Sequence, residues 1–261
     1  MQDKKYNLSV IVSYDIDDIQ YLNDCLATIP SGCEILLIQN IAVSDPIKIL
    51  RPDFNIEIKS TTELNNGSVL IQGCLWYFKN GNVNNFSFSR ALNSAIQHCT
   101  SDWILKLDAD ERLTFPKSLL DSLKDMPESL GGLRCKITNW SKHATMEASA
   151  AFMSDSIRLF RNNPKIRWKY HAHEEILPAL TLHRFLVVDS HYHIFHLGYR
   201  DDKQIIASKL IRNFYLNCKD VLDEPVNVRN MQLLYKSLTA LKDLGVFQEL
   251  KESFNVNISG N

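Results

Sequence analysis

The chain has 261 residues, of which 45% are hydrophobic and 23% are charged. This composition is typical of a folded globular protein and excludes collagen-like, coiled-coil and intrinsically disordered chains. The 29 basic and 30 acidic side chains give a net charge of −1, so no overall positive field favours nucleic acid or an anionic membrane as a partner.

The charge is unevenly distributed along the chain. Residues 1–130 hold 11 basic and 17 acidic side chains, whereas residues 131–261 hold 18 and 13, so the second half is the better candidate for binding an anionic ligand. The six cysteines form no CxxC pair, which favours free thiols in a reducing compartment. The first apolar run is too short for a signal peptide or a membrane span. We therefore expect a cytoplasmic protein, with peripheral contact at the inner face of the membrane left open.

The first elements alternate between strands and helices. Residues 8–14 (LSVIVSY) form an apolar, β-branched run typical of a buried strand. Apolar residues at spacings of three and four predict a helix over residues 18–29, and residues 34–39 and 55–59 predict two further strands. This βαβ order predicts a mostly parallel sheet with helices on its faces.

Ligands of open parallel sheets bind at the carboxyl ends of the strands. This rule makes binding candidates of the polar residues at the ends of the first two predicted strands, namely Ser13, Tyr14, Asp15, Gln39 and Asn40. The sequence has no GxGxxG after the first strand and no GxxxxGK[ST] anywhere, so it indicates neither a dinucleotide site nor a P-loop.

The most informative segment follows a helix that Ser87 can cap. A strand predicted over residues 103–107 (WILKL) runs directly into Asp108, Ala109, Asp110 and Glu111. Alternate side chains at the end of a strand point the same way, so Asp108 and Asp110 can share one divalent cation. The alternative is a solvated acidic turn.

Beyond Pro116 the sequence predicts both strands and helices, and after about residue 203 it predicts helices alone. Strands are predicted at residues 133–140, 156–161, 185–189 and 191–197, and helices at residues 117–125, 203–218, 230–243 and 247–254. A domain boundary is plausible only near residues 198–203.

Seven of the eight histidines follow residue 140. The H-x-H patterns at His171/His173 and His191/His193 place paired rings on one face of a strand, as in several zinc sites. Glu174 and Glu175 follow His173, and either carboxylate can supply a general base. Five cations between residues 158 and 169 suit a phosphate or an anionic acceptor. A core or surface role is the alternative for each of these groups.

The order of these segments resembles the family 2 glycosyltransferases of the GT-A fold. The resemblance is carried by LSVIVSY, EILLIQN, FSFSRALNSAIQHCTSDWILKLDADERLT, SIRLFRNNPKIRWKYHAHEEI and HIFHLGY, over about residues 7–200. It implies an α/β GT-A (Rossmann-like) catalytic domain at residues 1–200 and a C-terminal helical extension at residues 201–261. It also implies inverting transfer of a sugar from a nucleotide-diphosphate donor, with a UDP-sugar favoured, to a hydroxyl of a glycan, lipid-linked saccharide or protein.

The resemblance further implies roles for single residues. Asp110 and His196 would coordinate Mn²⁺ or Mg²⁺, and Asp108 would contact the metal or the ribose. Glu174 would deprotonate the acceptor hydroxyl. The donor would meet Ser13, Tyr14, Asp15, Asn40, Arg90 and Ala109.

Two other functions are open at this point. The histidine group suggests a zinc-dependent hydrolase. Asn40 stands where the family commonly has an acidic residue, which suggests a sugar-nucleotide-binding module without catalysis.

Overall fold

The computed structural model describes residues 8–14, 18–39, 61–64, 68–72, 78–79, 82–83, 87–114, 119–141, 152–199 and 203–245. Within these residues the main sheet has nine strands in the order β3-β4-β2-β1-β7-β10-β9-β11-β8. The strands are β1 (Ser9–Tyr14), β2 (Glu34–Gln39), β3 (Thr61–Leu64), β4 (Ser68–Gln72), β7 (Trp103–Asp108), β8 (Glu111–Thr114), β9 (Leu130–Ser141), β10 (Phe152–Arg161) and β11 (Leu186–Tyr199). A second, two-stranded sheet pairs β5 (Phe78–Lys79) with β6 (Asn82–Val83).

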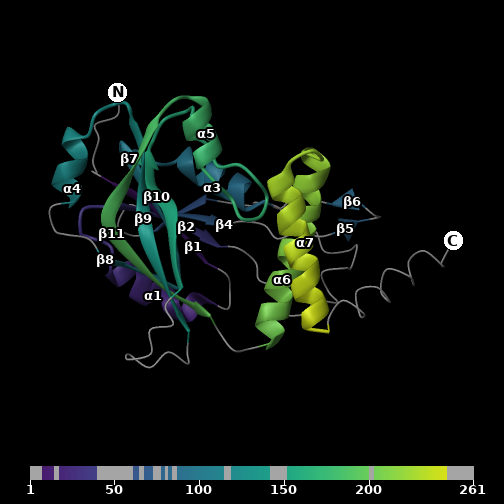
Figure 1. Ribbon diagram of the computed structural model, residues 1–261. Helices are drawn as coiled ribbons and strands as arrows, with labels where there is room; N and C mark the ends of the chain where they lie inside the picture. Colours follow the sequence, from purple (N-terminus) through teal and green to yellow (C-terminus); the bar gives the residue numbers. More distant parts are fainter. Residues whose placement is uncertain are drawn as a thin grey trace.

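The helices lie on the faces of the sheet and beside it (Figure 1). They are α1 (Ile19–Ala27), α3 (Phe88–Ile96), α4 (Leu119–Ser122), the 3-10 helix η2 (Leu123–Asp125), α5 (Leu177–Leu182), α6 (Lys203–Asp223) and α7 (Val228–Asp243). None of the helices in the described part of the chain is both long enough and apolar enough to cross a membrane.

The main sheet is mixed, so the prediction of a mostly parallel sheet is wrong. Strands β4, β2, β1 and β7 are parallel to one another, and β9 is parallel to β11. Strands β3, β10 and β8 join antiparallel. The physical reason is that β10 follows β9 in the chain as its antiparallel neighbour, and such a pair needs no crossover helix. An apolar run reads the same for either strand direction.

The core consists of two apolar clusters, one on each face of the central strands. Alternate residues of β1 enter opposite clusters, with Val10 and Val12 in one and Ile11 in the other. Cys25 of α1 packs in the first cluster, whereas α3 and α5 contribute Ala95 and Leu180 to the second. Burial on both faces explains the continuous apolar runs of β1 and β7.

Several predicted elements are confirmed. The strands expected at residues 34–39 and 103–107 are β2 and β7. Ser87 caps α3, because its Oγ accepts a hydrogen bond from the Arg90 N–H at 3.2 Å. The two strands expected between residues 185 and 197 form the single strand β11, and neither β8 nor α5 was predicted. The strand expected at residues 55–59 and the helix expected at 247–254 lie outside the described residues.

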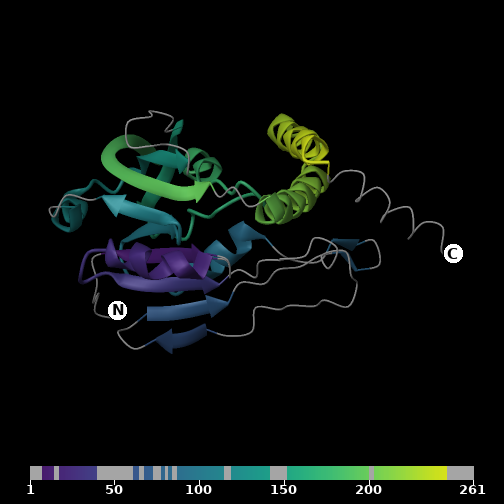
Figure 2. The ribbon, with the colours of Figure 1, turned by 90° about the horizontal axis from the view of Figure 1, so that it is seen from below.

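Helices α6 and α7 form a hairpin, called here the α6–α7 hairpin. The side-chain amide of Asn217 donates to the Ser237 Oγ at 2.7 Å in the buried contact between the two helices. The hairpin stands beside the sheet, on the side toward which β2 and β4 point (Figure 2). This side is the carboxyl end of the parallel strands, where ligands of such sheets bind.

Candidate active site

A cavity of about 230 Å³ opens at the carboxyl ends of β1 and β7. Six residues predicted from the sequence line it, namely Ser13, Tyr14, Asp108, Asp110, Glu174 and His196. Two other predicted residues are described but lie elsewhere. Ala109 is buried, with its N–H donating to the Ser13 carbonyl at 2.9 Å, and Arg90 is exposed on α3. Asp15 and Asn40 lie outside the described residues.

The Asp108 carboxylate is held by the protein on both of its oxygens. Oδ1 accepts a hydrogen bond from Ser13 Oγ at 2.6 Å, and Oδ2 pairs with Lys106 Nζ at 2.6 Å. Lys106 precedes Asp108 by two residues on β7, so both side chains point to the same face. Burial disfavours the charged form, but Lys106 and the Arg158 guanidinium, 3.7 Å away, hold the pKa of Asp108 well below its usual range. Asp108 therefore remains an anion bound to protein cations.

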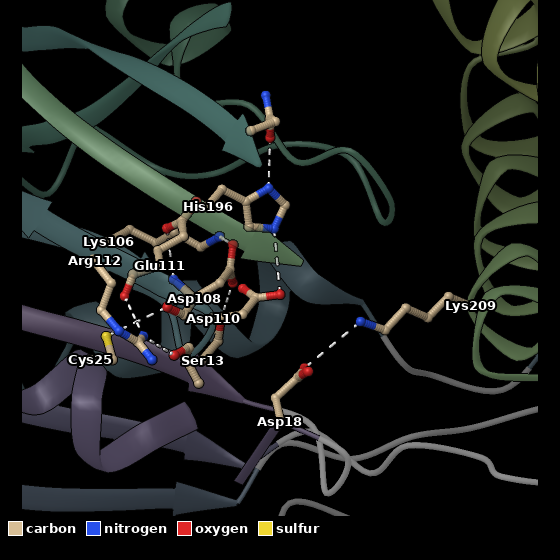
Figure 3. Close-up of polar contacts among 12 residues, drawn as sticks. Ser13, Asp18, Cys25, Lys106, Asp108, Asp110, Glu111, Arg112, His196 and Lys209 are labelled. Carbon is tan, nitrogen blue, oxygen red and sulfur yellow. Dashed lines mark hydrogen bonds and ion pairs between the residues drawn. The ribbon is translucent and has the colours of Figure 1, made fainter. Parts of the chain in front are cut away.

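Asp110 and His196 bring a carboxylate and an imidazole together at the cavity wall (Figure 3). His196 Nε2 lies 3.4 Å from Asp110 Oδ2, and its Nδ1 contacts Asn139 Oδ1 at 2.7 Å. Because that amide oxygen is an acceptor, Nδ1 is the donor in this contact. Burial lowers the pKa of His196, but the hydrogen bond to Asp110 and the nearby carboxylates outweigh it and raise that pKa above its ordinary value.

These side chains fit a divalent cation only in part. Among the described residues, no three His, Cys, Asp or Glu side chains are arranged to hold a metal ion. Asp110 Oδ2 and His196 Nε2 form a pair of oxygen and nitrogen donors, which suits Mn²⁺ or Mg²⁺ when substrate phosphates and water supply the remaining ligands. Asn139 orients the ring from behind, as outer-shell partners of metal ligands do. Asp108 fits less well because Lys106 and Ser13 already bind its oxygens.

Glu174 reaches the cavity from a loop between β10 and α5. Lys106 Nζ lies 3.6 Å from Glu174 Oε1, so this lysine, only 4% exposed, links Glu174 to Asp108. Sequence reasoning missed Lys106, although a lysine inside the apolar run WILKL was a usable signal.

The paired-ring interpretation of His171 and His173 is wrong. Both residues lie in the loop that precedes α5 and not on a strand. His171 Nε2 contacts Asp223 Oδ2 at 2.7 Å, whereas His173 lines the cavity. The two side chains therefore have different surroundings, and they do not form the basis of a zinc site.

Helix α6 forms a basic wall of the cavity. Lys209, Arg212 and Asn213 of α6 are among the residues that line it. Lys209 Nζ reaches across toward Asp18 Oδ2 at 3.8 Å (Figure 3). No local pattern in the sequence relates α6 to the ends of β1 and β7, so this wall was not predicted.

Most of the cations predicted to bind an anion between residues 158 and 169 have structural contacts. Arg158 Nη2 pairs with Glu111 Oε1 at 2.6 Å, and Glu111 Oε2 accepts the Asp108 N–H at 2.9 Å. Arg161 donates to the carbonyls of residues 126 and 127, and Arg167 to those of 163 and 166. The Arg158–Glu111 pair thus supports the backbone that carries Asp108.

No protein-family model matches the chain. Curated relatives include the SPbeta prophage-derived glycosyltransferase SunS of Bacillus subtilis strain 168 and glycosyltransferase SunS of Bacillus phage SPbeta. Each is 26% identical over 230 residues, which cover 85% of this chain and 47% of the relative. The chain therefore spans about half the length of these relatives. A TPR repeat-containing protein of Synechococcus elongatus is 40% identical over 94 residues, or 36% of this chain and 22% of that protein.

Similar solved structures include S. aureus TarS 1-349 in complex with UDP-GlcNAc. It has a TM-score of 0.43 and 12% identity, covering 96% of this chain and 92% of that one. The complex of TarS 1-349 with UDP has a TM-score of 0.42 and 13% identity, covering 90% and 71%. At these TM-scores the similarity does not by itself assign a fold or a function.

Proposed function

We propose that the protein is a metal-dependent, inverting glycosyltransferase of family 2 with a GT-A-like catalytic domain. The observation that carries the proposal is one cavity that combines the Asp110–His196 pair, the Glu174 carboxylate and the basic wall of α6. The similarity to the SunS glycosyltransferases over 85% of the chain supports the same reaction class. In this proposal the catalytic domain comprises residues 1–200, and α6 and α7 belong to an extension at residues 201–261.

In this proposal the donor is a nucleotide-diphospho-sugar, with a UDP-sugar favoured. Its nucleoside lies near Ser13 and Tyr14, with Asp15 and Asn40 as further contacts. Asp110 and His196 would hold Mn²⁺ or Mg²⁺. When bound, the divalent cation stabilises the negative charge that develops on the leaving diphosphate.

Glu174 is the proposed general base. It accepts the proton of the acceptor hydroxyl, whose oxygen attacks the anomeric carbon from the face opposite the departing diphosphate, which inverts the configuration. The acceptor is a hydroxyl of a glycan, a lipid-linked saccharide or a protein. Asp108 serves to position Ser13 and Lys106 around this site, since its carboxylate binds both of them.

The proposal is tested by thermal unfolding in the presence of UDP, GDP, CDP, dTDP or CMP, each with Mn²⁺ and with EDTA. We expect one nucleoside diphosphate to raise the melting temperature with Mn²⁺ and to lose most of this effect with EDTA, because a ligand of the native state stabilises it by mass action. A nucleotide screen without any shift would contradict the proposal. A metal-dependent shift without any hydrolysis or transfer of the matching nucleotide sugar would indicate a binding module instead.

Lys209 on α6 is expected to bind a donor phosphate. Lys209→Met should weaken binding of the stabilising nucleoside diphosphate about 10-fold, the loss expected for one charge-assisted hydrogen bond. Binding of the corresponding nucleoside, which has no phosphate, should be unchanged in isothermal titration. Lys236→Met is the matched control, because Lys236 is exposed on α7. Equal losses for the nucleoside and the diphosphate would show that Lys209 does not contact phosphate.

A further inference from the structure

The loop that presents Glu174, residues 169–175, is called here the Glu174 loop. Its ends are joined by reciprocal backbone hydrogen bonds between Lys169 and Glu175 at 2.9 and 3.0 Å. Tyr170 and His173 have φ values of 72° and 50°, the left-handed region that non-glycine residues rarely adopt. Such a backbone persists only where its surroundings hold it in place.

One buried carboxylate on α6 binds the middle of this loop. Asp220, only 4% exposed, accepts the His171 N–H on Oδ1 at 2.8 Å and the Ala172 N–H on Oδ2 at 3.3 Å. Asp223, one helical turn further on, contacts the His171 ring at 2.7 Å. The backbone N–H groups of His171 and Ala172, which precede His173 and Glu174 in the chain, thus donate to the helical hairpin and not to the sheet.

An arginine at the start of α7 binds the loop on both sides of Glu174. Arg229 Nη2 donates to the His173 carbonyl at 2.5 Å, and its Nε donates to Glu175 Oε1 at 2.8 Å. Its guanidinium lies 3.9 Å from the centroid of the Tyr170 ring, within the range of a cation–π contact. Arg229 therefore contacts both neighbours of Glu174 and both loop residues with positive φ, Tyr170 and His173.

The two anchors are fixed to each other. Asn230 Nδ2 donates to the Asp220 carbonyl at 2.9 Å in a buried contact between α7 and α6. Asn227 caps α7 by accepting from the Arg229 and Asn230 N–H groups. The turn of the hairpin thus holds Asp220 and Arg229 as one unit facing the loop.

We propose that the α6–α7 hairpin is the positioning element of the general base: through Asp220 and Arg229 it fixes the backbone that aims Glu174 into the cavity. This inference rests on the proposed function, in which Glu174 is the base. Without the hairpin contacts, the loop keeps the Phe88 N–H to His171 carbonyl bond and the Lys106–Glu174 ion pair. These contacts attach the loop to the core, and the Lys169–Glu175 bonds still close its ends, but none of them binds the backbone of Ala172 or His173.

The test uses the full chain with Asp220→Ala and, separately, Arg229→Met. The probe is hydrolysis of the nucleotide sugar whose diphosphate stabilises the wild type, since water then replaces the acceptor hydroxyl. We expect kcat to fall at least 10-fold in each variant, while the affinity for the nucleoside diphosphate changes less than 2-fold. Amide hydrogen exchange should accelerate in residues 169–175 and remain unchanged in β1 and β7.

Matched variants separate positioning from general loss of structure. Asp243→Asn makes the same loss of charge at the exposed far end of α7 and should behave as the wild type. Arg229→Lys should not restore kcat, because one ammonium group does not reproduce the two-sided contact of a guanidinium. Asp220→Asn retains a single acceptor oxygen and should fall between the wild type and Asp220→Ala.

The outcomes distinguish this inference from the proposed function. A wild type that hydrolyses no nucleotide sugar would contradict the proposed function, while the exchange data would still test whether the hairpin holds the loop. A wild type that is active, together with variants that keep its kcat and its exchange protection in residues 169–175, would overturn the inference alone. The Arg229 side chain is 24% exposed, so Arg229→Met is expected to fold. It keeps the test valid if Asp220→Ala fails to fold.

Discussion

Asp110→Asn is expected to lower sugar transfer by on the order of 100- to 1,000-fold, the loss typical of removing one group that stabilises developing charge. Asparagine has nearly the same shape but no charge, so it weakens the binding of a divalent cation beside His196. The fold should survive, because the Asp110 carbonyl still accepts the Leu197 N–H, and an amide can still contact the His196 ring. Initial rates of donor hydrolysis and the thermal unfolding curve measure the two effects separately.

Asp155→Asn is the matched control for this prediction, because Asp155 is exposed on β10 and its loss removes the same charge. Its rates should equal those of the wild type. Normal turnover of Asp110→Asn would exclude Asp110 as a metal ligand, and a loss of the folded baseline would show that its role is structural.

Arg158→Met is expected to destabilise the protein by about 3–5 kcal/mol, the usual result of breaking a buried ion pair from one side. Glu111, which is 1% exposed, would be left in the core next to Asp108 without its contact at 2.6 Å to a positive charge. For a chain of this size the loss corresponds to a fall in melting temperature of roughly 10 °C. Urea unfolding monitored by tryptophan fluorescence measures the change.

Arg134→Met gives the matched comparison. Arg134 pairs with Asp189 at 2.7 Å, nearly the same distance, but the side chains are 37% and 78% exposed. An exposed pair contributes about 0–1 kcal/mol, so this variant should unfold close to the wild type. The double variant Arg158→Met/Glu111→Gln should regain part of the lost stability, because the buried Glu111 carboxylate that lacked a partner is also removed. A similar, small effect of Arg134→Met and Arg158→Met would contradict the buried-pair interpretation.

The parts of the fold that depend on local physics were predictable from the sequence. Continuous apolar runs identified β1, β2 and β7, and the Ser87 cap identified the start of α3. The proximity of Asp110 and His196, separated by more than 80 residues, was expected only from the resemblance of two short motifs to one family.

The features that depend on tertiary arrangement were not predictable. An apolar run does not indicate the direction of its strand. The antiparallel pairing of β10 with β7, which makes the sheet mixed and not mostly parallel, was therefore not predictable. The sequence groups Glu111 with Asp108 and Asp110 as a candidate cation site, yet Glu111 begins β8 and pairs with Arg158, which is 47 residues away. The contribution of Lys209 to the cavity depends on how α6 packs beside the sheet. The sequence of α6 predicts only an amphipathic helix.

The cavity is assembled from distant parts of the chain, because Ser13 and Tyr14 end β1 whereas Lys209 and Arg212 belong to α6. During synthesis, a chain that has left the ribosome only as far as Tyr199 has the strands of the sheet but not the groups that anchor the Glu174 loop. Contacts between residues so far apart in sequence form late and slowly. Under the proposed function, sugar transfer would therefore reach its full rate only after the hairpin has been translated and has docked.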